Sequence, residues 1–186
     1  MKLNYTVREA CSKGESNRLR IAGSIPAVLY SKSTDAKHIA VGKSEFEAHL
    51  RSLQPGRLAT TRFALHDGNG NPINAILKDI QYHPTTYNVL HLDFEVLHDD
   101  AEINVRVPIE LVGTADCVGV KLGGVLRAVK RGLRVRCLPK DIPEAFYMDV
   151  RTLAARQSRR LKELDIPANV KPLDDLNEVA VIIAKR

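Results

Sequence analysis

The sequence lacks several features that mark common protein classes. It contains no tryptophan and only 5% aromatic residues, so we do not expect a surface that binds single-stranded nucleic acid mainly by stacking. No stretch approaches the roughly 20 apolar residues of a membrane helix, and the first residues lack the apolar run of a secretory signal. We therefore expect a soluble, cytoplasmic protein with no membrane partner.

Cysteine is scarce and widely spaced. Cys11, Cys117 and Cys137 form no Cys-x-x-Cys pair and have no histidine at zinc-site spacing, so we expect reduced thiols, no metal and no cofactor. The segment around Gly14 also lacks the Gly-x4-Gly-Lys-Ser/Thr spacing of a phosphate-binding nucleotide loop. No small-molecule substrate is expected.

The sequence is instead rich in lysine and arginine, which occur in blocks. The net charge is only +6, but residues 1–43 hold eight cations and three acids. Residues 121–140 hold seven cations and residues 151–162 hold five, both without an acid. One such block is compatible with an ordinary solvated surface, whereas three favour binding of a polyanion.

Short alternating apolar runs, separated by glycine, proline, asparagine and aspartate, predict a mainly β protein with a few short helices (β+α). The expected strands include residues 25–30, a hairpin of 58–65 and 73–82, and a strand at 89–97. At residues 98–102 the alternation gives way to a polar, acidic connector. We place a domain boundary here and expect a first domain at 1–96 and a second, smaller β-rich domain at 97–186.

Three segments have helical features. Ser44 and Glu47 have the spacing of a capping box, and the apolar residues that follow predict a helix that ends before Pro55. Residues 18–23 are consistent with a single helical turn after a polar loop, and residues 152–164 are a further candidate helix.

Two polar patches are candidates for the functional site. The first, residues 13–20, combines cations with hydroxyl and amide groups that suit adjacent phosphates. The second joins Asp79, Gln81 and His83 on one strand with His91 and Asp93 on the next. Whether these strands pair with the two polar sets on one face cannot be read from the sequence.

Several interpretations of the second patch stay open. His83, His91 and Asp93 are weak candidates for a metal site or for hydrolytic chemistry, since no nucleophile turn lies nearby. A face that contacts RNA base edges and 2′-hydroxyls fits the residue types better. His83, next to Pro84, also suits a residue that only holds a turn. Alternation alone places Tyr30 in the core.

Several motifs resemble one bacterial family. Residues 13–20 (KGESNRLR), 25–30 (IPAVLY), 78–84 (KDIQYHP) and 91–94 (HLDF) resemble the 5S-rRNA-binding large-subunit ribosomal protein twenty-five family. The second half, with GVKLGGVL at 119–126, is similar to the extra domain of its long form, the general stress protein CTC type. Asn17 and Ser31 depart from the usual basic residue and glycine of the family.

The resemblance implies a non-catalytic structural protein of translation. It implies a β-barrel-like N-terminal domain that binds 5S rRNA, with other large-subunit ribosomal components as partners, cytoplasmic location on the ribosome, and a monomer when free. It moves Tyr30 from the core to the interface. The implied RNA contacts are Arg8, Lys13, Ser16, Arg18, Arg20, Tyr30, Gln81, His83, His91 and Asp93.

Two other functions remain as alternatives at this point. One is a metal-dependent hydrolase that uses His83, His91 and Asp93. The other is a stress factor whose second domain docks a protein partner through residues 121–140.

Overall fold

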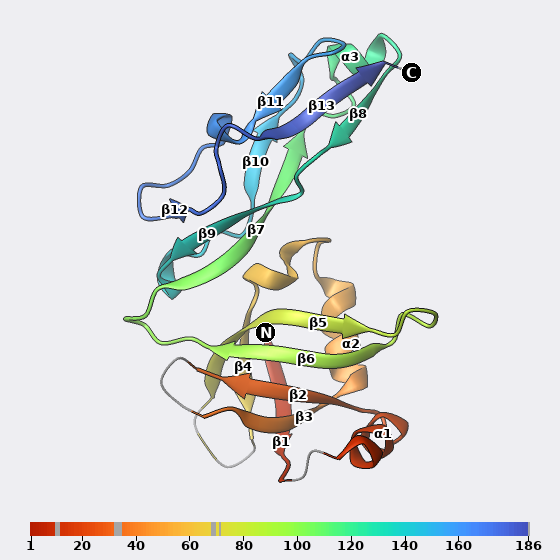
Figure 1. Ribbon diagram of the computed structural model, residues 1–186, viewed down its shortest axis with the longest axis vertical. Coiled ribbons are helices and arrows are strands. Elements are labelled where there is room, and N and C mark those ends of the chain that lie inside the picture. Colours follow the sequence, from red (N-terminus) through yellow and green to blue (C-terminus); the bar gives the residue numbers. More distant parts are fainter. Residues whose placement is uncertain (10–11, 32–34, 68–69, 71, 186) are drawn as a thin grey trace. The chain divides into compact units, whose positions relative to one another are not determined.

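The structure is a computed structural model that describes residues 1–9, 12–31, 35–67, 70 and 72–185 (Figure 1). It divides into two compact units, Met1–Ala101 (unit 1) and Glu102–Arg186 (unit 2). The boundary after residue 96 stays a prediction. In the described part of the chain, no helix combines the length and the apolar content needed to cross a membrane.

Unit 1 is a closed β-barrel with the strand order β1-β3-β2-β6-β5-β4 (Figure 1). The strands are β1 (Lys2–Val7), β2 (Ser24–Tyr30), β3 (Lys37–Gly42), β4 (Arg62–His66), β5 (Ile73–Tyr82) and β6 (Val89–Val96). The pairs β1–β4 and β2–β6 are parallel, and the other pairs are antiparallel. The barrel expected for the first half of the chain is confirmed.

The barrel interior is filled by one side of each strand, as the period of two requires. On β2, for example, Ala27 and Leu29 are buried against the shared core. Three phenylalanine rings continue it: Phe63 lies with its ring centroid 6.4 Å from that of Phe46 and 5.8 Å from that of Phe94. Edge-to-face and tilted contacts at these distances are favourable for aromatic pairs.

The helix expected after residue 44 exists, but its cap was predicted wrongly. Helix α2 (Lys43–Ser52) buries Phe46 in the barrel core. Its N-cap is Gly42, with no side-chain hydrogen bond. Because β3 ends at Gly42 and the helix follows at once, Ser44 already lies within the first turn and cannot cap it.

The predicted hairpin is confirmed in its pairing and corrected in its start. Strands β4 and β5 are antiparallel neighbours, and Gly68 and Asn69 of the predicted turn lie outside the described residues. Residues 58–60 belong to the 3-10 helix η1 (Arg57–Thr60) instead of the strand. Gly56 enters this element with φ +90°, a left-handed conformation that glycine adopts without steric cost.

The polar segment that precedes β2 is a helix, contrary to the expected loop and single turn. Helix α1 spans Lys13–Ile21, and the side chain of Ser12 caps it by accepting a hydrogen bond from the Glu15 N–H at 3.2 Å. No residue of α1 is buried, so the sequence carries no apolar stripe by which to recognise it.

Unit 2 consists of two small sheets, which confirms its expected β-rich character. One has the order β10-β7-β9-β12 and the other β11-β13-β8. The elements are β7 (Ile103–Val112), α3 (Val118–Lys121), β8 (Gly124–Ala128), β9 (Gly132–Cys137), η2 (Pro139–Asp141), β10 (Phe146–Asp149), β11 (Ser158–Arg160), η3 (Leu161–Glu163), β12 (Lys171–Pro172) and β13 (Val179–Lys185).

The prediction of a helix at residues 152–164 is wrong. That segment contains a turn, strand β11 and the 3-10 helix η3, because β11 pairs with β13 and Arg156 adopts φ +66°. Leu153, Leu161 and Leu164 in this segment are buried by tertiary packing. Tertiary pairing has therefore overridden local spacing.

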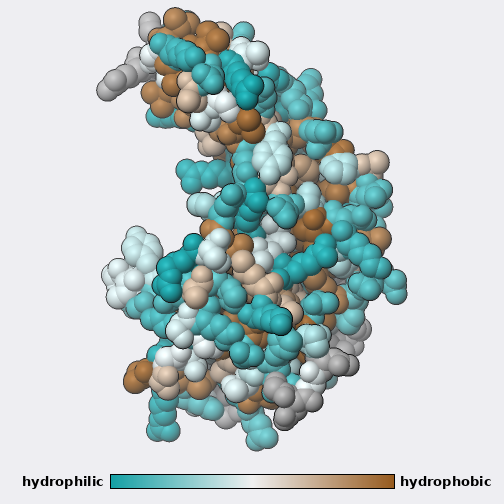
Figure 2. All heavy atoms as spheres, turned by 180° about the vertical axis from the view of Figure 1, so that it is seen from behind, coloured by the Kyte–Doolittle hydropathy of each residue, from teal (hydrophilic) through white to brown (hydrophobic). Residues whose placement is uncertain are grey.

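The surface of unit 2 carries apolar side chains at one end. Figure 2 shows them gathered near the end that holds α3 and β8. The exposed ones there are Val118, Leu122 and Val125. Cys117 and Cys137 are buried and are not joined in a disulfide, while Cys11 lies outside the described residues.

Candidate nucleic-acid interface

Helix α1 presents cations that are not neutralised by neighbouring acids. At 100° per residue, Lys13, Ser16 and Arg20 share one face, and Arg18 lies on nearly the opposite side. Lys13 and Arg18 are exposed. Within the part of the chain that the structure describes, no ion pair involves Lys13, Arg18 or Arg20. Their charge is therefore available to an external anion.

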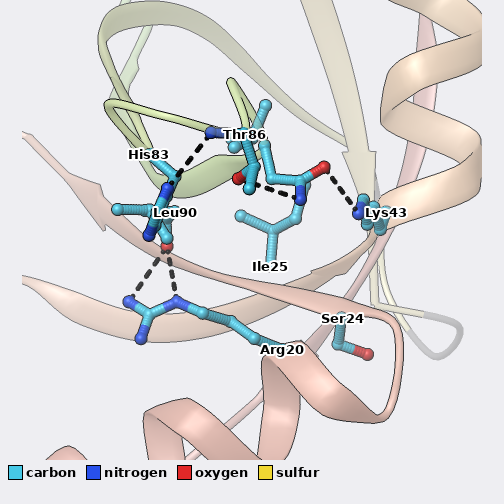
Figure 3. A pocket seen from close by; sticks show the side chains of 9 residues that line it. Arg20, Ser24, Ile25, Lys43, His83, Thr86 and Leu90 are labelled. Carbon is cyan, nitrogen blue, oxygen red and sulfur yellow. Dashed lines mark hydrogen bonds between the residues drawn. The ribbon is translucent and has the colours of Figure 1, made fainter.

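Arg20 also anchors α1 to the barrel. Its Nε and Nη2 both donate to the carbonyl oxygen of Leu90, at 3.2 and 3.1 Å, and its Nη1 donates to Oδ1 of Asn17 at 3.0 Å. Figure 3 shows the guanidinium reaching this carbonyl from the helix. The guanidinium has five N–H donors, so donors remain for a ligand after these bonds are made.

The pairing of β5 with β6 brings most of the second patch together. Gln81 lies opposite His91, and Asp79 lies opposite Asp93. Opposite residues of an antiparallel pair share a face, so these four side chains form one polar surface on the outside of the barrel. The register that the sequence left open is thus the one that unites them.

His91 and Asp93 interact directly on this face. Nδ1 of His91 lies 2.6 Å from Oδ1 of Asp93, and both side chains are partly exposed. The contact assigns a proton to Nδ1. In the neutral ring, Nε2 is then left as an acceptor, and in the charged ring it is a second donor. Either form suits a polar group of a ligand.

Tyr30 lies on the same face and is not part of the core. It is half-buried, whereas alternation placed it inside; its neighbour Leu29 occupies the interior instead. Burial raises the pKa of the Tyr30 phenol, and the nearby carboxylates of Glu95, Asp93 and Asp79 raise it further. The phenol therefore remains a hydrogen-bond donor at neutral pH.

One carboxylate of this face is already neutralised. Glu95 is 7% exposed, and its Oε2 lies 2.6 Å from Nζ of Lys78. A buried carboxylate needs such a partner because the loss of hydration is costly. Asp79 and Asp93 are more exposed, so they would repel phosphates and suit donors such as base amines or 2′-hydroxyls.

Arg8 extends the polar surface across the barrel. Its N–H donates to the carbonyl of His38 at 3.0 Å. His38 pairs with Val28, and Val28 pairs with Asp93, so the four residues form one row across neighbouring strands. At about 4.8 Å per strand, the row spans about 14 Å. Nε and Nη1 of Arg8 are shielded from solvent and have no hydrogen-bond partner among the described residues.

His83 stands apart from the sheet cluster, at the turn after β5. Its Nδ1 accepts hydrogen bonds from the N–H groups of Thr85 and Thr86, at 3.4 and 3.3 Å. The ring proton is therefore on Nε2. The structure thus gives His83 the turn-holding role that the sequence analysis left open.

Two residues of this region escaped the sequence analysis. Lys43, the first residue of α2, donates from Nζ to Oδ1 of Asn88 at 3.1 Å. Lys43 and Asn88, the two residues concerned, line a pocket of about 150 Å³ together with Arg20, Ser24 and His83 (Figure 3). Neither carries a signal in the sequence, because α2 and the β5–β6 turn meet only in the folded chain.

Several cations of the two unit 2 blocks form ion pairs with acids. Lys130 pairs with Glu178, and Arg134 pairs with Asp174 at 2.7 Å. Arg159 pairs with Glu163, also at 2.7 Å. These acids come from sequence positions outside the blocks, so part of the charge of the blocks is neutralised in the folded chain.

No group of three or more His, Cys, Asp or Glu side chains that could hold a metal ion occurs among the residues described. The fold and the site define a β protein whose first unit is a closed barrel with a cationic helix beside a polar sheet face. Comparison with known proteins shows the family to which the chain belongs.

Residues 3–94 match the model of the ribosomal L25p family, and residues 102–186 match that of the C-terminal domain of ribosomal protein TL5. The chain belongs to the ribosomal L25p family, in its long form with the TL5-type second domain. The resemblance predicted from the motifs is confirmed.

Proteins from three chlamydial species are similar to this chain over its whole length. The chain is 45% identical to proteins named large ribosomal subunit protein bL25 from Chlamydia abortus and Chlamydia muridarum, and 42% identical to that from Chlamydia pneumoniae. Each comparison covers 186 residues and all of both chains.

Proposed function

We propose that this protein is a structural, non-catalytic constituent of the large ribosomal subunit that binds 5S rRNA through unit 1. Membership of the ribosomal L25p family supports the ribosomal role, in the cytoplasm, with other large-subunit components as neighbours. The observation that carries the RNA site is that the cations of α1 form no ion pair with an acid among the described residues and lie beside the polar face of β5 and β6.

The two parts of the site serve different groups of the RNA. Lys13, Arg18, Arg20 and Arg8 supply positive charge for phosphates, which sets affinity and salt dependence. Because the cations of α1 project from two sides of a helix with no buried residue, the helix suits a groove between two phosphate tracks. Ser16 adds a hydroxyl that can donate to a phosphate oxygen.

The sheet face supplies selectivity. Tyr30, Gln81, His91 and Asp93 offer donors and acceptors at fixed register positions. Exposed carboxylates there disfavour bare phosphates and favour base amines and 2′-hydroxyls. His83 belongs to the site through the turn that it holds.

Equilibrium binding of the full chain to 5S rRNA tests this function. We expect clearly tighter binding than to an unrelated RNA duplex of equal length at moderate salt, and His91→Ala should cost more than about 1 kcal/mol of binding free energy. Equal affinity for the two RNAs would contradict the proposal. Asp116→Ala, an exposed position in unit 2, is the matched control and should change affinity little.

A further inference from the structure

The tip of the β5–β6 hairpin holds an exposed aromatic side chain on an unfavourable backbone. Tyr87 has φ +54°, a left-handed conformation that is uncommon for a bulky residue. Its side chain is 77% exposed. Neither the backbone conformation nor burial of the ring therefore explains the presence of tyrosine at this position.

A dense set of hydrogen bonds imposes this conformation. The Tyr87 N–H donates to the carbonyl of His83 at 2.9 Å, and the His83 N–H donates to the carbonyl of Asn88 at 2.8 Å. Nδ1 of His83 holds the intervening N–H groups of Thr85 and Thr86, and Asn88 Nδ2 donates to the Thr86 hydroxyl at 3.2 Å. The tip is thus ordered before any ligand binds, which lowers the entropic cost of binding.

Two cations, Arg20 and Lys43, lie near the base of the tip, and Lys43 also pairs with Glu47 at 3.8 Å. Asn88 accepts a hydrogen bond from Lys43, and Arg20 and Lys43 both line the pocket at the base of the tip (Figure 3). The chain neighbours of Tyr87, Thr86 and Asn88, line the same pocket. Proteins can hold an unpaired nucleotide with an exposed ring and nearby cations, because the cations bind the phosphate while the ring stacks on the base.

We propose that Tyr87 stacks on an unpaired base of the bound RNA, with Arg20 and Lys43 close to the adjoining phosphate. The proposal rests on the RNA-binding function proposed above and adds a contact outside the ten residues implied by the family resemblance. His83 is a positioning residue in this arrangement, since it holds the turn that presents the ring.

The absence of tryptophan from the sequence allows a direct test. In the full chain, Tyr87→Trp introduces a single tryptophan at the tip, and stacking on a base should quench its fluorescence. We expect the tryptophan fluorescence to be quenched on titration with 5S rRNA. The midpoint of quenching should equal the midpoint of binding measured by an independent assay. Tyr147→Trp, at a 57% exposed position of unit 2, is the control and should not be quenched.

Tyr87→Gly separates stacking from stability. Glycine accepts a positive φ without steric cost, so the thermal midpoint should stay equal or rise, while Kd should increase about 5- to 100-fold through the loss of one stacked base. His83→Ala should weaken binding in the wild type but not in the Tyr87→Gly background.

The outcomes distinguish the two proposals. If wild-type protein binds 5S rRNA while Tyr87→Trp is not quenched, or if it is quenched no more than the Tyr147→Trp control, the stacking contact is refuted and the RNA-binding function stands. If the wild type shows no preference for 5S rRNA, the proposed function itself fails.

Discussion

At the residue scale, Arg20 combines two roles that the sequence could not separate. Its guanidinium anchors α1 by a two-pronged hydrogen bond to the Leu90 carbonyl and keeps donors free for an anion. A nine-residue helix with no buried residue is marginal by itself, so this anchor contributes to holding α1 in place.

Substitution of Arg20 should reveal both roles. We expect Arg20→Ala to weaken 5S rRNA binding by more than about 1 kcal/mol, since it removes a charge-assisted contact and loosens α1. Arg20→Lys keeps the charge but cannot form the planar fork, so it should show an intermediate affinity. Filter binding and amide hydrogen exchange of α1 measure the two effects. Unchanged affinity in Arg20→Ala would contradict this role.

At the element scale, the β9 region of unit 2 depends on a carboxylate that is nearly inaccessible. The Asp174 side chain is 5% exposed. Burial alone would raise its pKa, but the N–H and guanidinium of Arg134, together with Lys130, outweigh burial and lower the pKa below its usual range. The backbone N–H of Arg134 donates a hydrogen bond to Oδ2 of Asp174 at 3.1 Å, and Nε of Arg134 donates one to Oδ1 at 2.8 Å.

This pKa shift predicts an acid-dependent stability. The pKa of the Asp174 carboxyl is lower in the folded chain than in the unfolded chain, where it is about 3.9. The interaction therefore stabilises unit 2 above about pH 4, and this stabilisation is lost as the pH falls through the folded pKa. Asp174→Asn should lower the unfolding free energy at pH 7 by about 1.5–3 kcal/mol.

Urea unfolding of the full chain between pH 3 and 7 measures the effect. Asp174→Asn should also flatten the loss of stability below about pH 4. Asp116→Asn is the control, because its pair with Lys121 is largely exposed and should contribute less than about 1 kcal/mol. Equal effects of the two substitutions would contradict the stabilising role of the Asp174 carboxylate.

At the scale of the whole molecule, the proposed binding surface does not coincide with the highest density of cations along the sequence. The two acid-free blocks lie in unit 2, where Lys130, Arg134 and Arg159 are paired with acids. Helix α1 holds fewer cations, but they have no acid partner among the residues described. Free charge, and not total charge, determines counterion release.

Truncation tests this distribution. A chain of residues 1–101, which retains the closed barrel and its core, should bind 5S rRNA within about threefold of the full-length affinity. With about four phosphate-contacting cations, log Kd should rise with log salt at a slope of about 3 to 4 for either chain. A tenfold or greater loss of affinity would place part of the interface in unit 2.

The sequence by itself determined the β-rich class, the clustering of cations near the N-terminus and the family motifs, because alternation, turn residues and motifs are local properties. It misjudged α1, the cap of α2 and residues 152–164. Polar helices carry no apolar stripe, and β11 forms only because β13 is available to pair with it.

Only the tertiary structure decided which polar residues meet. The pairing of Gln81 with His91 and of Asp79 with Asp93 depends on the register between two strands, and a shift of one residue would have turned one set to the other face. The pairing of Lys130 with Glu178 and of Arg134 with Asp174 likewise depends on acids distant in sequence. Both are long-range properties of the packed chain, which no local pattern encodes.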